Sequence, residues 1–555
     1  MNKEFRVTGK AQFHREAALH AAPLRMAIGI FSAVAALTLH GGVVAWYRFD
    51  EVSPGTPVTS SVSFLNAVDP GKLPGKPYSM GDPDTSDYTT FGSLADFMPV
   101  ATNCAPDVLY VIDPVSGTTN RNDRSLFFRY ADDPSAGKPA RYGGCVKVES
   151  DSSLTLTNLT VECIVKPIKM PGGLANNGWT LVSKHYSSSD VLTYSLCINN
   201  TTYKPYVNIY DADGNLVTSV NGTIQLTGSR SILDGKWHHI AFTVESRTAK
   251  LYVDYHCEKT FTLPGPLVYK DDAPLCIGSA RTIYKPGGFI DEVRISDEAL
   301  TTPSFLRFFN TTPIFHAGFE GSLNAEVLHV ASTYGIGTSG RVDEAHAYPA
   351  FTNDVANVRI VKEADGAVIR KTNGNALYVD GGQVKYPHNA DLEMTEMTVE
   401  CFMKYKEATN YGGLLRFNQS NSNWGTTPIW SVWFLNGELR MRLDLTDPEY
   451  QNQTHSFGTS FCDGKWHHLG ITFKQFAEGI SVCAYDNYRQ IGSSWWIPGQ
   501  MFQYANGSCL GIGTSGKSSY VFSGFIDELR ISQGVLPVEH FMRAVPKPGV
   551  TVIFR

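Results

Sequence analysis

Apolar and polar residues alternate along short stretches of this chain, with the period of two that is typical of half-buried β-strands. After a pair of histidines, large apolar side chains fall at Ile240, Phe242 and Val244, with smaller or more polar residues between them. The stretches 469–473 and 161–165 alternate in the same way. Clusters of Gly, Asn, Asp and Pro separate such stretches. The pattern predicts an all-β chain built of antiparallel β-sandwiches.

The landmarks of this pattern occur twice, in the same order. Thr-Val-Glu-Cys stands at 160–163 and 398–401, Asp-Gly-Lys-Trp-His-His at 234–239 and 463–468, and Phe-Ile-Asp-Glu-(Val/Leu)-Arg-Ile-Ser at 289–296 and 525–532. The spacing between copies varies in the connections, as expected for divergent copies of one fold. We therefore predict two tandem sandwich domains, with these limits: an N-terminal segment at 1–43, domains at 44–310 and 311–545, and a tail at 546–555.

Residues 52–140 of the first domain are its least regular part. They are rich in Pro, Gly, Ser, Thr and Asp, which favour turns and loops. We interpret this stretch as a long loop insertion on the sandwich, with an added hairpin around 107–113.

The N-terminal segment 1–43 combines a basic leader with the uncharged, mostly apolar stretch 26–45. This composition is typical of a secretory signal peptide, and Ala-Val-Ala at 33–35 supplies a cleavage site. An uncleaved membrane anchor is the alternative, since about 20 apolar residues span a bilayer; a buried strand or helix is a third. A signal peptide or an anchor would place the protein in the periplasm, at the cell surface or outside the cell.

Charge and cysteine content narrow the function classes. The net charge is −6 and no basic run occurs, so nucleic acid is not an expected partner. Cys163 and Cys401 coincide in the two copies, whereas the other cysteines do not, which argues against a shared disulfide framework. We expect these two as small buried residues on strands. A domain-specific disulfide such as Cys257–Cys276 is left open.

The order of these landmarks, with an aromatic residue shortly before Phe-Asp or Phe-Glu at each domain start, resembles that of laminin G-like jelly rolls. These domains belong to the concanavalin A-like lectin/glucanase superfamily, and the resemblance covers nearly all of 44–545. It implies sandwiches of two curved antiparallel sheets in extracellular modules that bind glycans or proteins. It also implies a structural calcium ion in many members, and glycoside hydrolases among the relatives.

The paired histidines look like a metal site, but strand geometry argues against it. Adjacent residues of a strand point to opposite faces, so His238 and His239 cannot hold one ion together. We expect them to begin a framework strand in each domain, with Trp237 and Trp466 packing beside it.

The Ile-Asp-Glu segments are better metal candidates, because a carboxylate on a mostly buried strand needs a partner. The resemblance implies calcium at these residues: Asp50, Glu51 and Asp291 in the first domain, and Glu320 and Asp527 in the second. Calcium takes six to eight oxygen ligands, so these would form only part of a site. The alternative is a structural carboxylate that caps a loop or pairs with an arginine on another strand.

Catalytic motifs are absent from the sequence, whereas aromatic residues suited to binding are present. No Glu-x-Asp-x-x-Glu run, Gly-x-Ser-x-Gly or His-Glu-x-x-His occurs, so no catalytic residue is assigned and an enzyme is not expected. Trp495 and Trp496 lie in a predicted connection, where an exposed indole could stack on a sugar. Tyr186 and Tyr203 are weaker candidates of the same kind.

These observations predict an exported, non-catalytic protein that binds glycans or the cell surface. A structural or assembly protein that binds other proteins is the alternative, and a glycoside hydrolase with a divergent site is a third. The sequence makes no prediction of oligomeric state.

Overall fold

The structure is a computed structural model that describes residues 42–546 apart from a set of gaps. The gaps are 52–61, 81–99, 104–108, 123, 129–142, 170–177, 187–190, 270–272, 279–286, 311–312, 320–326, 330–338, 343–349, 354–358, 363–367, 374, 381–383, 387–389, 407–410, 419–427, 444–452, 500–501, 503, 505–508 and 514–521. The predicted N-terminal segment therefore lies almost entirely outside the described residues. Within them, no helix is long and apolar enough to cross a membrane.

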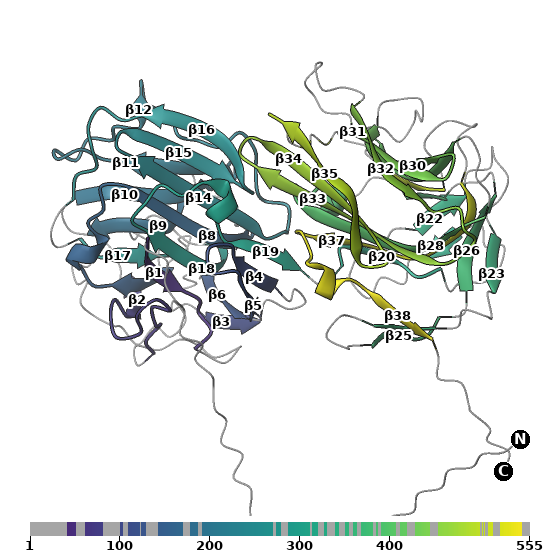
Figure 1. The fold of residues 1–555 in the computed structure, drawn as a ribbon. Helices are drawn as coiled ribbons and strands as arrows, with labels where there is room; N and C mark the ends of the chain where they lie inside the picture. Colours follow the sequence, from purple (N-terminus) through teal and green to yellow (C-terminus); the bar gives the residue numbers. More distant parts are fainter. Residues whose placement is uncertain are drawn as a thin grey trace, which may run out of the picture. The chain divides into compact units, whose positions relative to one another are not determined.

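The first domain is a sandwich of two antiparallel sheets (Figure 1). One sheet has the order β16 (His256–Thr262), β15 (Thr248–Val253), β14 (His238–Glu245), β8 (Leu159–Pro167), β18 (Gly288–Ser296), β6 (Arg124–Phe128) and β3 (Val100–Asn103), and β1 (Val43–Tyr47) also pairs with β18. The other has the order β11 (Pro205–Ile209), β10 (Val191–Asn199), β9 (Gly178–Tyr186), β17 (Leu275–Ile277), β7 (Gly143–Val148) and β2 (Gly75–Met80). Inward side chains of both sheets form one core, in which Trp179 is fully buried.

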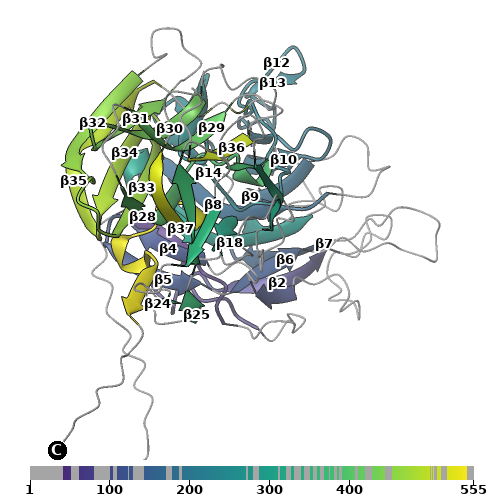
Figure 2. The same cartoon turned by 90° about the vertical axis from the view of Figure 1, so that its right-hand side faces the viewer.

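The second domain repeats this arrangement. Its first sheet has the order β23 (Ala350–Asn353), β26 (Asn375–Asp380), β37 (Ser523–Gln533), β28 (Met397–Tyr405), β33 (His467–Phe476), β34 (Gly479–Asp486) and β35 (Arg489–Pro498), with β20 (Phe315–Ala317) on β37. Its second sheet has the order β21 (Val327–His329), β22 (Ser339–Val342), β27 (Val384–Tyr386), β36 (Cys509–Ile512), β29 (Gly412–Asn418), β30 (Pro428–Leu435), β31 (Glu438–Leu443) and β32 (Gln453–Ser460). Strands of this second sheet can be followed in Figure 2. Its core buries Trp430.

The repeated motifs occupy equivalent central strands. Thr-Val-Glu-Cys lies on β8 and β28, Phe-Ile-Asp-Glu on β18 and β37, and the histidine pairs begin β14 and β33. Ile240, Phe242 and Val244 face the core, as their alternation predicts. The all-β tandem sandwich is therefore confirmed.

The stretch 52–140 contributes strands as well as connections. Of its described strands, β2 joins the six-stranded sheet, whereas β3 and β6 join the larger one. A hairpin does occur near the predicted place, formed by β4 (Leu109–Asp113) and β5 (Thr118–Asn122). It extends to β19 (Arg307–Asn310), and the second domain has a matching small sheet of β25 (Val368–Asn373), β24 (Arg359–Lys362) and β38 (Arg543–Pro546).

The two sheets of the second domain approach each other at one edge. Strand β35 approaches β32 at Gly492, which has a φ of 61°. A Cβ at Gly492 would lie 2.8 Å from the carbonyl oxygen of Phe457, so only glycine fits there without a backbone shift.

Candidate functional sites

Each Thr-Val-Glu-Cys strand places a glutamate at the centre of a buried charge network. The Glu162 carboxylate accepts hydrogen bonds from Arg294 Nε (2.6 Å) and from the Leu306 backbone N–H (2.9 Å), and its other contact is His239 Nε2 (2.8 Å). Burial alone would raise the pKa of Glu162, but Arg294 and His239 outweigh burial and hold it below its usual value.

The second domain contains the same network. Glu400 contacts Arg530, His468 Nε2 (2.9 Å) and the Met542 backbone N–H (2.9 Å), and its pKa is lowered against burial by Arg530 and His468. Sequence reasoning missed both networks. The available signal was an acidic residue repeated within an otherwise apolar strand in both copies.

The paired histidines face opposite sides, as strand geometry predicts. Whereas His239 reaches Glu162, His238 lies between two other carboxylates: its Nδ1 is 2.9 Å from Asp254 and its Nε2 is 2.9 Å from Asp234. Burial would lower the pKa of His238, but Asp234 and Asp254 outweigh burial and raise it to about 9. His238 is therefore an imidazolium at neutral pH.

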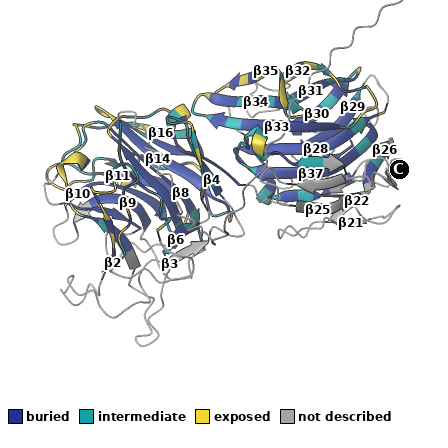
Figure 3. Cartoon of the chain, turned by 60° about the horizontal axis from the view of Figure 1, so that its bottom comes forward, coloured by how far each residue is buried: buried dark blue, intermediate teal, exposed yellow. Residues whose placement is uncertain are grey.

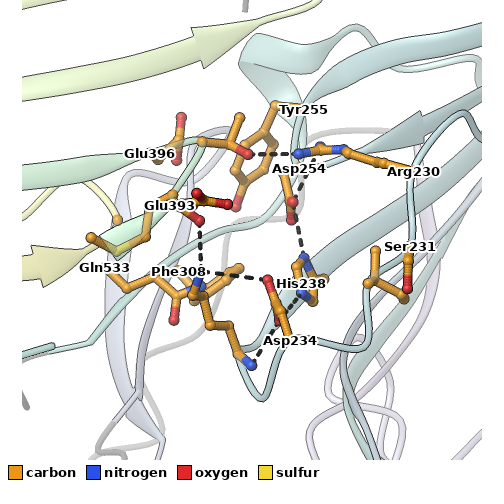
Figure 4. Close-up of a pocket in the computed structure, with 15 residues that line it drawn as sticks. Arg230, Ser231, Asp234, His238, Asp254, Tyr255, Phe308, Glu393, Glu396 and Gln533 are labelled. Atoms are coloured by element: carbon orange, nitrogen blue, oxygen red, sulfur yellow. Dashed lines mark hydrogen bonds and ion pairs between the residues drawn. The ribbon is translucent and has the colours of Figure 1, made fainter. Parts of the chain in front are cut away.

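A pocket beside His238 is lined by residues of both domains (Figure 4). Lys236 Nζ donates to the carbonyl oxygens of Ala390 (2.8 Å) and Glu393 (2.6 Å). Arg230 Nη1 donates to Thr395 Oγ1 at 2.9 Å. Lys236 and Arg230 belong to the first domain and already bind groups of the second domain. We therefore interpret the pocket as part of the contact between the two domains, with a structural role.

The Asp291–Glu292 segment departs from the expected strand geometry. Glu292 has a φ of 48°, and the register with β8 shifts between Asp291 and Arg294. This bulge turns both carboxylates toward one amide: Asn122 Nδ2 lies 2.7 Å from Asp291 and 3.0 Å from Glu292. Strict alternation would make the two acids face opposite ways, but the bulge breaks it.

N–H donors satisfy this buried acidic pair. The Glu292 carboxylate accepts from Trp46 Nε1 (2.5 Å) and Arg48 Nε (3.3 Å), and Asp291 Oδ1 accepts from the Glu292 backbone N–H (2.9 Å). Burial raises the pKa of both carboxyl groups, to about 7 for Glu292. Arg294 pairs across the strands with Glu162, rather than along its own strand.

Of the remaining calcium candidates, Asp50 lies near the acidic pair, since its charge helps to raise the pKa of Asp291 and Arg48 contacts both Asp50 and Glu292. Asp50 forms an ion pair with Arg48 at 3.1 Å, and Glu51 is exposed and accepts from the Leu65 N–H. Asp527 is buried on β37, and Glu320 lies outside the described residues. No cluster of three or more His, Cys, Asp or Glu side chains suited to a metal occurs in the described part of the chain. Calcium at these residues stays a prediction.

The adjacent tryptophans lie on strand β35, not in the connection that we predicted. Trp495 points inward and stacks on His455, with ring centroids 5.4 Å apart. Trp496 points outward and is 45% exposed. Figure 3 shows the exposed residues of β35, in contrast to the buried strands β28 and β33.

A short polar row continues from Trp496 across the sheet. Trp496 lies opposite Ser481 on β34, which in turn lies opposite Lys474 on β33. The Phe476 ring lies 5.5 Å from the Trp496 ring and 5.3 Å from Lys474 Nζ. The row thus combines a flat indole with a hydroxyl and an ammonium group.

The two tyrosine candidates lie at different places in the first domain. Tyr203 is half-buried against the core of the first domain, with a φ of 53°. Tyr186 ends β9, and its side chain lies outside the description.

The framework residues are placed largely as expected. Trp237, Cys163 and Cys401 are buried, whereas Trp466 is only half-buried, beside Phe402. All the described cysteines are free thiols, including Cys257 and Cys276.

The described fold and sites define a tandem antiparallel β-sandwich protein with a buried charge network in each domain. The chain belongs to the concanavalin A-like lectin/glucanases superfamily, whose family model matches residues 141–304 and 369–540, more than half of its length. This confirms the resemblance that the repeated motifs indicated. A comparison with curated proteins found no match.

Solved structures with similar folds share little sequence with this chain. Domain 4 of AbnA, an extracellular GH43 arabinanase from Geobacillus stearothermophilus solved with arabinotriose, is 17% identical, with 41% of this chain and 96% of that one covered and a TM-score of 0.26. Domains LG4-5 of the mouse laminin alpha1 chain are 13% identical, with 73% and 92% covered and a TM-score of 0.21. The sialidase module CBM40 of Ruminococcus gnavus, bound to alpha2,6 sialyllactose, is 18% identical, with 26% and 79% covered and a TM-score of 0.22.

Proposed function

We propose that this chain is an exported, non-catalytic glycan-binding protein and that Trp496 is its main sugar-stacking residue. The observation that carries the proposal is the exposed indole of Trp496 on the outer face of β35. Aromatic side chains with a few well-placed polar groups are typical of ligand sites. Ser481 and Lys474 supply such groups on the same face.

This surface belongs to the second domain alone. In the first domain, the strand register puts Thr262 in the place of Trp496 and Glu245 in the place of Lys474. The two domains therefore share a framework but not this aromatic row. The second domain can then bind the ligand, while the first domain supports the second or acts as a spacer.

Two sequence features support the remaining parts of the proposal. The sequence has no Glu-x-Asp-x-x-Glu run, and the repeated acids Glu162 and Glu400 are engaged in buried networks. The basic leader with its apolar stretch supports export to the cell surface or beyond. The same leader would provide a membrane anchor if it is not cleaved.

A glycan array probed with the full chain tests the proposal. Trp496→Ala should weaken glycan binding about tenfold or more, equivalent to about 1.4 kcal/mol. It should leave the unfolding midpoint nearly unchanged, because surface substitutions rarely cost more than about 0.5 kcal/mol.

Two matched variants separate binding from folding. Thr262→Ala, at the same place in the first domain, should change neither binding nor stability. Trp495→Ala should instead destabilise the second domain by about 3 kcal/mol, because it empties a core position. If no glycan binds and a protein partner is recovered by pull-down, the protein-binding alternative replaces this proposal.

A further inference from the structure

The turn between β33 and β34 of the second domain is bound by residues of the first domain. Arg307 Nη1 donates a hydrogen bond to the carbonyl oxygen of Gln475 at 3.0 Å. The Ala477 backbone N–H donates to Thr302 Oγ1 at 3.2 Å, and Ala477 also packs against an apolar cluster of the first domain that includes Tyr255. The position of this turn therefore depends on the contact between the two domains.

Phe476 in this turn connects the domain contact to the exposed indole of Trp496. The Phe476 ring centroid lies 5.1 Å from Arg307 Cζ and 5.5 Å from the Trp496 ring centroid. The same guanidinium carbon lies 3.7 Å from the ring centroid of Tyr255 in the first domain. Planar guanidinium groups stack favourably on aromatic rings. Four side chains from both domains thus form one continuous row that ends at Trp496.

Hydrogen bonds fix the orientation of Arg307 within this row. Its side chain is only 6% exposed and pairs with Glu396 of the second domain, and Nη2 donates to the carbonyl oxygen of Thr302 at 3.0 Å. The guanidinium cannot turn without losing at least one of these bonds. The Phe476 ring that packs on it is therefore held beside Trp496, whereas an unsupported phenyl side chain would keep its rotamer freedom.

The hairpin that carries Phe476 is longer than its counterpart in the first domain. Glu245 pairs with Thr248 and encloses a turn of two residues, whereas the equivalent pair, Lys474 and Ser481, encloses six residues. The additional residues include Phe476 and reach the first domain. The support for the indole is therefore a local extension of the second domain and not part of the shared framework.

The capping of the two hairpins shows what is specific to the second domain. Asn158 Oδ1 accepts a hydrogen bond from the Ser246 N–H at 2.8 Å, and Glu396 Oε1 accepts one from the Gln475 N–H at 2.9 Å. Both domains thus cap this hairpin with a side-chain oxygen from the same place. In the second domain alone the capping group is a carboxylate, and it also binds Arg307.

We propose that Arg307 of the first domain is a positioning residue for the sugar-binding surface at Trp496, and that glycan binding and the contact between the domains support each other. The inference rests on the proposed glycan-binding function and adds a residue of the other domain to it. An aromatic surface that is fixed before binding loses less conformational freedom when a sugar stacks on it. Because coupling between two sites is reciprocal, a bound glycan should also stabilise the domain contact.

The environment of Trp496 can be measured without any ligand. The full chain is labelled with fluorotryptophan, and the fluorine resonance that Trp496→Phe removes is assigned to this residue. Arg307→Lys keeps the charge but removes the planar group that packs on Phe476. Glu396→Gln keeps an acceptor for the Gln475 N–H but removes the charge partner of Arg307. Each of these two variants should shift or broaden the Trp496 resonance.

Two control variants separate the positioning of the indole from general effects. Lys236→Ala removes a different contact between the domains. Arg489→Gln removes an exposed arginine on β35, the strand that carries Trp496. Both should leave the Trp496 resonance unchanged. An unchanged resonance in Arg307→Lys and Glu396→Gln, or an equal change in Lys236→Ala, overturns the inference.

The glycan array measures the consequence for binding. Arg307→Lys should weaken the binding of each glycan that depends on Trp496 by about fivefold or more, whereas Lys236→Ala should not. In calorimetry, the tightest-binding glycan of the array should raise the unfolding temperature of both domains in the wild type, but only that of the second domain in Arg307→Lys.

The outcomes separate this inference from the proposed function. Binding that depends on Trp496 but is unchanged in Arg307→Lys overturns the inference and leaves the glycan function standing. Absence of binding to every glycan overturns the proposed function and the coupling together. The fluorine resonance then decides only whether Arg307 positions the indole.

Discussion

At the residue scale, each domain buries a charge network around one glutamate. Glu162 lies between the core residues Val161 and Cys163 and points to the other face, where Arg294 and His239 enclose it. A buried carboxylate is tolerable only when it is paired and hydrogen-bonded. The same arrangement around Glu400 shows that the pairing is repeated in the second domain.

Glu162→Gln should lower the free energy of unfolding by about 3 kcal/mol, because it removes one of the two carboxylates that pair with the buried Arg294, the other being Asp113. Glu400→Gln should do the same in the second domain. Urea denaturation followed by tryptophan fluorescence measures both. Glu149→Gln is the control, since that side chain is 76% exposed; an equal effect in the control would rule out the network as the cause.

The pH dependence of the first domain should report His238. Its pKa is raised in the folded state, so its contribution to stability is fully present below the unfolded pKa of about 6.5 and is lost as pH rises through about 9. The carboxylates that face it are Asp234 and Asp254, with Arg230 and Lys236 beside them. Thermal unfolding between pH 6 and 10 measures the loss, which should be about 3 kcal/mol.

His238→Gln should flatten that pH profile. A variant that keeps the wild-type slope would mean that another group is responsible. His467 also lies between two carboxylates in the second domain, and its pKa is also raised. Its contribution to stability should therefore also be lost as the pH rises.

At the element scale, alternation predicted the strands well but could not predict the local departures from them. The period of two placed Ile240, Phe242 and Val244 in the core and separated the two histidines, as the structure shows. The bulge at Glu292 could not be predicted, because a positive φ at a glutamate has no signal in the sequence.

The position of Trp495 and Trp496 shows a second limit of prediction from the sequence. Trp495 and Trp496 stand between Ser494 and Ile497-Pro498, which suggested a connection, but pairing with β34 makes this stretch a strand. Once the strand is known, alternation gives the opposite orientations of Trp495 and Trp496. The cross-strand rows that form the candidate surfaces depend on long-range register, which one sequence does not determine.

Calcium binding can be tested on each domain by its unfolding transition. If calcium is bound, its addition should raise the melting temperature and a chelator should lower it by mass action. Asp527→Asn should remove the shift in the second domain, and Asp291→Asn should have no effect on it in the first, where N–H donors occupy that carboxylate. Equal melting temperatures with calcium and with chelator would show that neither domain binds calcium.

At the scale of the whole chain, the two copies use the same loop differently. In the first domain, Lys236 donates hydrogen bonds to carbonyl groups of the turn at 390–393, and its side chain is only 6% exposed. Lys465, at the same place in the second domain, is 79% exposed. A framework motif has thus become a contact between domains in one copy and has remained at the surface in the other.

Glu396→Ala should weaken this junction. Arg307 is buried, lies 3.7 Å from the Tyr255 ring centroid and pairs with Glu396, so removing the carboxylate should cost about 3 kcal/mol. Calorimetry should then separate the unfolding of the domains into two transitions. Lys465→Ala is the control and should leave the calorimetric trace as in the wild type; a single unchanged transition for Glu396→Ala would show that this ion pair does not couple the domains.

The close approach at Gly492 has a consequence for solubility. Strand β35 ends the order of its sheet, and the exposed edge of a sheet is a template on which other chains aggregate. At Gly492 the backbone of β32 lies against this strand, leaving little room for a foreign strand to add there. A larger residue at this position would push the two strands apart. The variant should then be less stable, and more of it should be insoluble.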